Sequence, residues 1–106
     1  MRKGKVFQHN NFAGLIEEDE EGFKFTYDDE YILSQGEPVS LTMPIRVKAY
    51  NSKTMFPFFD GLIPEGWLLN IAEKNWKVNS KDRMGLLLSV CKETIGSVSI
   101  VKEEEK

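Results

Sequence analysis

The chain has 106 residues, and its content of 41% hydrophobic and 29% charged residues is typical of a globular protein that folds as one domain. Its formal net charge of −3 argues against a broad phosphate-binding surface, so we expect no direct contact with nucleic acid. The absence of a membrane-length apolar run, of a secretion signal and of a second cysteine predicts a cytoplasmic protein without membrane contact.

Strand patterns dominate the first third of the chain, where strands are predicted over residues 5–8, 12–16 and 23–27. A turn is expected at Asn10–Asn11, between the first two strands. The last of them has aromatic residues that alternate with polar ones, which predicts one buried face. The acidic run Glu17–Glu21 is predicted to be the solvated loop of a hairpin, because its spacing matches no calcium-binding loop.

Short elements are predicted in the next segment. Asp28 is a good N-cap for a single helical turn over residues 28–33. Gly36 and Pro38 then interrupt the chain, and residues 39–43 alternate as a strand that ends at Pro44. Residues 45–53 are predicted to be a connection that includes a turn at 50–52.

A corner and a helix are predicted over residues 56–76, around which the rest of the chain is expected to be arranged. Aromatic residues at 56, 58 and 59 lead into a sharp corner at Asp60-Gly61. Pro64 suits the first position of a helix that runs to Trp76, and Glu65 places a negative charge at its positive end. Gly66 in the first turn indicates either close packing against the backbone or a need for freedom at the corner.

The last part of the chain predicts one more helix and one more strand. Ser80 is the expected N-cap, and an apolar stripe follows at helical spacing, formed by Met84, Leu87, Leu88 and Cys91. Residues 97–101 alternate as a strand, and the tail at 102–106 is expected to fray. We therefore predict an α+β fold: a small antiparallel β-sheet with two or three helices, in a single compact domain over residues 1–106.

Residues that could carry chemistry are few. His9 and Cys91 are the only histidine and the only cysteine, which is too few for a zinc site, and no glycine-rich phosphate loop is present. Asp60 and Glu65 could form an acid–base pair, but ordering the turn and stabilising the helix start explain them better. We predict no catalytic residue, no cofactor and no metal site, and hence a protein that is not an enzyme.

Three segments carry a resemblance to a known family: PVSLTMP at 38–44, FFDGLIPEG at 58–66 and IGSV at 95–98. Together with the helix around 82–88, they resemble the small N-terminal subdomain of HipA-type serine/threonine kinases. The resemblance covers nearly the whole chain. The sequence departs from the family pattern at four positions, with Gly61 for the usual Asn, Cys91 for Gly, Glu93 for Asp and Ser97 for Ala.

The resemblance implies a regulatory protein, because the ATP site, the catalytic Asp and the metal ligands of such kinases belong to a core that this sequence does not contain. The chain is similar to the HipS-type component of tripartite HipBST-type toxin–antitoxin systems. This similarity implies an antitoxin that binds and neutralises a separately encoded HipA-like (HipT-type) kinase, with a helix-turn-helix DNA-binding protein as a further partner. A stabilising or activating subunit of a split kinase, and a non-functional remnant of one, remain alternatives.

The predicted partner-binding residues lie at the corner. An exposed aromatic anchor beside a carboxylate is a common composition for the centre of a binding surface. We therefore expect contact with the kinase from Trp67, together with Glu65, Ile63, Phe59 and Asp60. The pattern is equally compatible with a Trp67 that is buried in the core, and the sequence leaves both positions open.

Overall fold

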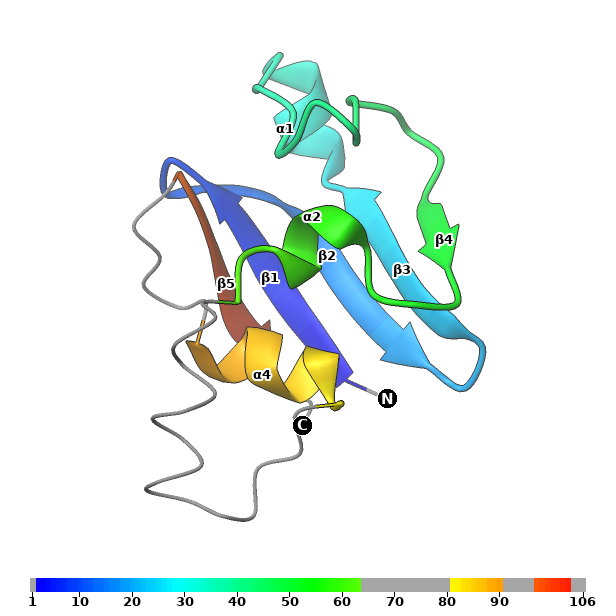
Figure 1. Ribbon diagram of the computed structural model, residues 1–106. Helices are drawn as coiled ribbons and strands as arrows, with labels where there is room; N and C mark the ends of the chain where they lie inside the picture. Colours follow the sequence, from blue (N-terminus) through cyan, green and yellow to red (C-terminus); the bar gives the residue numbers. More distant parts are fainter. Residues whose placement is uncertain (1, 64–80, 91–96, 104–106) are drawn as a thin grey trace.

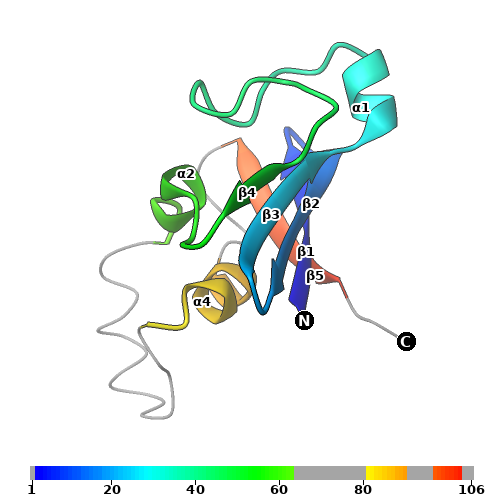
Figure 2. The same cartoon turned by 90° about the vertical axis from the view of Figure 1, so that its right-hand side faces the viewer.

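A five-stranded antiparallel sheet forms the body of the molecule in the computed structural model, which describes residues 2–63, 81–90 and 97–103 (Figure 1). Its strands are β1 (Arg2–Gln8), β2 (Asn11–Asp19), β3 (Gly22–Tyr27), β4 (Tyr50–Ser52) and β5 (Val98–Glu103), in the order β4-β3-β2-β1-β5. The helices α2 (Pro57–Asp60) and α4 (Arg83–Val90) cover one face, and α1 (Asp29–Leu33) lies at one end (Figure 2). This arrangement confirms the predicted α+β class.

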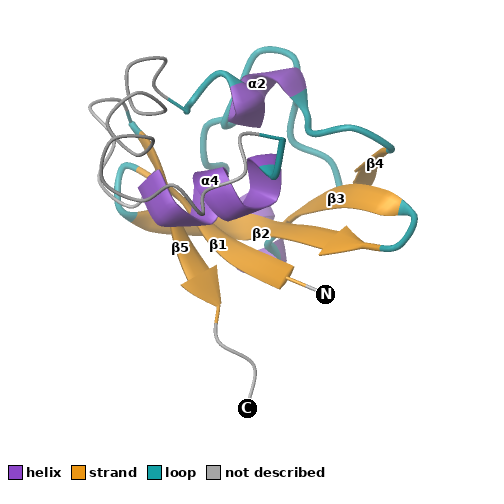
Figure 3. Ribbon diagram, turned by 60° about the horizontal axis from the view of Figure 1, so that its bottom comes forward, coloured by secondary structure: helices purple, strands orange, loops and turns teal. Residues whose placement is uncertain are grey.

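The core lies between the sheet and the helices. Figure 3 shows α4 lying over one face of the sheet. Phe25 of β3 is fully buried and contacts two other rings, those of Tyr27 and Phe59, at centroid distances of 4.8 and 5.3 Å. The predicted buried face of β3 is therefore confirmed. Met84 and Leu87 are also fully buried, which confirms the apolar stripe of α4 over its described part.

The approach of α4 to the sheet depends on Gly4 in β1. A Cβ atom at this position would lie 2.7 Å from Cδ2 of Leu88 and 2.9 Å from Cγ2 of Ile100. Glycine therefore lets the Leu88 and Ile100 side chains pack directly over the backbone of β1, and a larger residue would displace them.

The turn between β1 and β2 falls one residue earlier than predicted. His9 and Asn10 form it, with φ angles of 50° and 68°, and Gln8 faces Asn11 across the two strands. A two-residue hairpin turn of this kind requires positive φ at both central positions, which Asn tolerates well. The turn geometry therefore sets the register.

The acidic run is mostly strand, so the predicted loop at Glu17–Glu21 is wrong for its first three residues. β2 continues to Asp19, and only Glu20 and Glu21 form the turn. The register places Glu17 opposite Lys3 on one side and Lys24 on the other. Opposite charges on neighbouring strands stabilise such pairings by roughly 0.2–1 kcal/mol each, which favours the longer strand.

Residues 39–43 are not the predicted strand. Val39 and Met43 are buried on either side of a tight turn from Ser40 to Met43, whose tip exposes 97% of Leu41. The buried hydroxyl of Tyr27 holds this loop, because it accepts a hydrogen bond from the Val39 backbone N–H and donates one to the Met43 carbonyl. The Tyr27 hydroxyl of β3 thus supplies hydrogen bonds that a neighbouring strand was expected to supply.

Two further boundaries differ from prediction. Residues 50–52, predicted as a turn, form β4, in which Tyr50 lies opposite Phe25. β5 continues to Glu103, where Lys102 and Glu103 pair with Gly4 and Lys3, so the expected fraying of the tail is wrong at these two residues.

The helix predictions have mixed outcomes. Asp28 caps α1 as predicted, since its side chain accepts a hydrogen bond from the Tyr31 N–H at 3.3 Å. The predicted helix at 64–76 and the predicted cap Ser80 lie outside the described residues. Within the part of the chain that the structure describes, no helix has the length and apolar character needed to cross a membrane.

Candidate partner-binding site

The predicted corner begins with α2, a single helical turn. Pro57 occupies its first position, where a missing N–H costs nothing, and Gly61 closes it by donating its N–H to the Pro57 carbonyl at 2.9 Å. The helix buries Phe59 in the core with Phe58 partly buried beside it, while Asp60 at its end stays partly exposed.

Phe59 and Ile63 are core residues, contrary to their predicted place in a partner-binding surface. Phe59 is fully buried and Ile63 is 6% exposed. The ring of Phe59 packs among three other aromatic rings, those of Phe25, Phe56 and Phe58, at centroid distances of 5.3, 6.1 and 5.1 Å. Both side chains therefore support the corner from inside the fold.

Asp60 connects the end of α2 to the start of α4. Its Oδ1 atom accepts a hydrogen bond from Nε of Arg83 at 2.5 Å, and the two side chains are 42% and 30% exposed. This ion pair joins two points that flank residues 61–82. Glu65 and Trp67 belong to that interval but lie outside the described residues, so their role at the corner stays a prediction.

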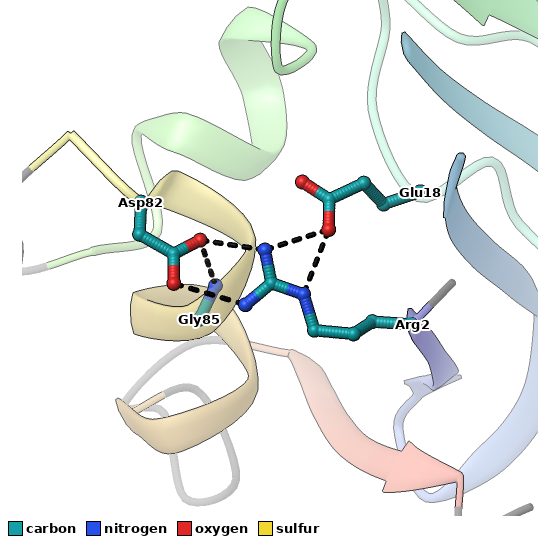
Figure 4. A network of polar contacts seen from close by, with 4 residues as sticks. All are labelled: Arg2, Glu18, Asp82 and Gly85. Atoms are coloured by element: carbon teal, nitrogen blue, oxygen red, sulfur yellow. Dashed lines mark hydrogen bonds and ion pairs between the residues drawn. The ribbon is translucent and has the colours of Figure 1, made fainter. Parts of the chain in front are cut away.

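A second polar network fastens α4 to the sheet (Figure 4). The guanidinium of Arg2 in β1 donates to both carboxylate oxygens of Asp82, at 2.9 and 2.7 Å, and its Nε donates to Glu18 of β2 at 2.7 Å. Asp82 also accepts a hydrogen bond from the Gly85 N–H at 3.1 Å and so caps the first turn of α4. One carboxylate thus both starts the helix and anchors it.

The electrostatics of this network favour its charged state. The hydrogen bonds from Arg2 and from the Gly85 N–H hold the pKa of Asp82 below its usual value. Hydrogen bonds to the carboxylates of Asp82 and Glu18 raise the pKa of Arg2 above its usual value. Gly85 is required by this geometry, because a Cβ atom there would lie 2.4 Å from Oδ2 of Asp82.

Sequence reasoning missed this network and the Asp60–Arg83 pair. Asp82 is a favourable N-cap residue, a local signal that could have shown where α4 begins. Arg2 lies 80 positions away, and no local pattern joins the two residues.

Groups that could carry chemistry are few among the described residues. No cluster of three or more His, Cys, Asp or Glu side chains that could hold a metal is found among them. His9 lies at the exposed β1–β2 turn, while Cys91 is outside the described residues. The predicted absence of catalytic, cofactor and metal sites stays a prediction for the chain as a whole.

Comparisons with known proteins agree with the resemblance seen in the sequence. The family model described as HipA N-terminal domain matches residues 4–101. An uncharacterized protein of Haemophilus influenzae (strain Rd) is 38% identical over 105 residues, which are 99% of this chain and 96% of that protein. A solved structure of the "N-terminal domain of HipA toxin" is 37% identical, with a TM-score of 0.79 over 100% of this chain and 96% of the other. The chain belongs to the HipA N-terminal domain family.

Proposed function

We propose that this protein is a non-catalytic antitoxin that binds and neutralises a separately encoded HipA-like serine/threonine kinase. The family match over residues 4–101 carries the proposal, since it supports a component of a HipA-related toxin–antitoxin system. The HipA N-terminal domain is the non-catalytic part of the kinase. The relative from Haemophilus influenzae has nearly the same length as this chain, which supports a domain that works as a separate protein.

The corner is the proposed contact surface. In this proposal Trp67 anchors the kinase core, with the carboxylates of Glu65 and Asp60 beside it, and hinders closure of the kinase's nucleotide site. The Asp60–Arg83 ion pair supports the idea, because it ties together the two ends of the interval that contains Trp67. Phe59 and Ile63 contribute by stiffening the base of the corner from within the core.

The proposed complex works in the cytoplasm and has two partners. The first is a HipT-type kinase core, and the second is a helix-turn-helix DNA-binding protein. The net charge of −3 supports DNA association through the second partner alone, because an acidic chain attracts no phosphate backbone.

Replacement of Trp67 tests the contact surface. We expect Trp67→Ala to weaken kinase binding by roughly 2–4 kcal/mol, the loss typical of an aromatic anchor, and to abolish neutralisation. The measurement is calorimetric titration of the purified kinase core with each variant. Leu41→Ala is the matched control, because Leu41 is 97% exposed on a different loop and its truncation should leave binding unchanged. A folded Trp67→Ala protein that binds and neutralises as well as the wild type would exclude this surface.

An assay of kinase activity with and without the chain separates the proposal from its main alternative. A stabilising or activating subunit would use similar contacts, but kinase activity would rise on addition of the chain. A non-functional remnant would neither bind the kinase nor change its activity.

A further inference from the structure

An open cavity of about 610 Å³ lies at the end of the sheet that carries α1, whereas α4 lies toward the other end (Figure 1). The β1–β2 turn, α1 and the chain after α1 form its walls. Three carboxylates line it, those of Asp28, Glu30 and Glu37. Among the described residues that line it, His9 is the only side chain that can carry a positive charge.

Gln8 supplies a buried polar group at the same cavity. It lines the cavity but is only 6% exposed, and its Oε1 atom accepts a hydrogen bond from the Ser97 hydroxyl at 3.3 Å. Its amide nitrogen has no protein partner within the described parts of the chain. A buried amide donor without a partner is unfavourable, and among the described residues this nitrogen has none, so it is available to donate to a ligand in the cavity.

The wall formed by α1 and the following turn is held in place without a ligand. The hydroxyl of Tyr31 donates to the backbone carbonyl of Glu37 at 2.5 Å, and the Tyr31 ring is 6% exposed. Gly36 packs against this ring so closely that a Cβ atom would lie 2.3 Å from it. The backbone that carries Glu37 is therefore fixed relative to α1, which carries Glu30.

We propose that this cavity binds an arginine side chain of a second polypeptide. The carboxylates of Glu30 and Glu37 would receive the guanidinium, whose planar N–H groups suit carboxylate oxygens. The amide of Gln8 would donate to a backbone carbonyl of the arriving segment. Phe12, which also lines the cavity and is 36% exposed, offers apolar surface for the arginine stem.

Other ligands fit less well. An anion would meet three carboxylates, and a bare metal ion would lack a ligand cluster, since none is found among the described residues. Free arginine carries the same guanidinium, and its ammonium and carboxylate offset each other, so charge alone does not distinguish it from a peptide arginine. An arginine within a polypeptide has neither of these end charges and provides a backbone carbonyl to which Gln8 can donate. The inference goes beyond kinase neutralisation and does not depend on it.

The test is an NMR titration of the full chain with N-acetyl-arginine methylamide as the probe. We expect saturable shifts of the Gln8 side-chain amide and of the Tyr31 and Glu37 backbone amides. The same derivative of citrulline has nearly the shape of arginine but no charge, and it should bind roughly tenfold more weakly or worse. Free arginine, which lacks the peptide carbonyl, should bind no more tightly than the blocked probe.

Charge-neutralising variants identify the carboxylates. Glu30→Gln with Glu37→Gln should weaken probe binding roughly tenfold, and both side chains are exposed enough for the variant to fold. Glu20→Gln with Glu21→Gln changes the net charge equally at the distant β2–β3 turn and should leave binding unchanged.

Several results would overturn the inference: no saturable shift, equal binding of the citrulline probe, equal losses in both double variants, or tighter binding of free arginine than of the blocked probe. None of these results bears on kinase neutralisation, which is measured with the kinase core itself.

Discussion

Asp82 combines two stabilising roles that substitution can separate. As the cap of α4 it accepts the Gly85 N–H, and as the partner of Arg2 it accepts two guanidinium hydrogen bonds. Asn can still cap a helix but carries no charge, whereas Ala can do neither. Because the two charged side chains are 36% and 38% exposed, solvent weakens the ion pair's contribution.

We expect Asp82→Asn to lower the free energy of unfolding by about 1 kcal/mol or less, and Asp82→Ala by about 1 kcal/mol more. The pKa of Asp82 is depressed in the folded state, so its contribution is present above the ordinary aspartate pKa of 3.8 and is lost as pH falls through the folded pKa. The wild type should therefore lose more stability on acidification than Asp82→Asn. Urea unfolding at a series of pH values measures both effects, and equal acid sensitivity of the two proteins would contradict the proposed role.

At the scale of elements, the hydroxyl of Tyr27 holds the loop at 39–43. Tyr27 in β3 is 2% exposed and bonds the loop at both Val39 and Met43. Burial raises the pKa of Tyr27 to about 12, so the hydroxyl keeps its proton in the folded state when the unfolded chain begins to ionise near pH 10. A raised folded pKa means that stability is complete below pH 10 and declines as pH rises toward 12.

Replacement by Phe keeps the ring and removes the hydroxyl. We expect Tyr27→Phe to cost about 1–3 kcal/mol, because the buried Val39 N–H and Met43 carbonyl lose their partner. Hydrogen exchange at the Val39 amide should accelerate, and the decline in stability above pH 10 should be smaller than in the wild type. Unchanged exchange at Val39 would show that other contacts hold the loop.

Elements with strong local patterns could be predicted from the sequence. The buried face of β3 and the stripe of α4 follow from alternation and from helical spacing, and both are confirmed. The predictions are wrong where residues distant in the sequence determine the local structure. The loop at 39–43 is held by the Tyr27 hydroxyl, although its own alternation predicted a strand. The acidic end of β2 is strand because basic residues lie opposite it.

The candidate site could be predicted only in part, for the same reason. The motif drew attention to the corner, but the composition of an aromatic cluster does not say which rings face inward. Phe59 turns out to be enclosed by other rings, and the contact of Asp60 with Arg83 spans 23 positions. Both are properties of packing between α2, α4 and the sheet.

At the scale of the whole molecule, two ion pairs hold α4. Arg2–Asp82 fixes it to the sheet, and Asp60–Arg83 fixes it to α2. The segment between the helices is thereby tied at both ends. If the proposed contact surface lies on that segment, the two ion pairs contribute more to the affinity for the kinase than to the free energy of unfolding.

Arg83→Gln tests this division of roles, because it breaks the pair and leaves the proposed contact residue Asp60 in place. The ion pair is partly exposed, so we expect a stability loss below about 1 kcal/mol. Binding to the kinase core should weaken roughly tenfold, the effect of losing about 1.4 kcal/mol of preorganisation. Lys53→Gln, which removes an exposed positive charge just after β4, is the control and should bind normally. A loss of stability as large as the loss of binding would instead assign the pair a purely structural role.

The most direct test of the central claim is a phosphoryl-transfer assay in which the purified chain is titrated into a purified HipA-like kinase core of the HipT type. Antitoxin function predicts that transfer from labelled ATP falls to background as the chain saturates the kinase, and that the chain alone transfers none. Transfer that stays constant, or that rises, across the titration would contradict neutralisation.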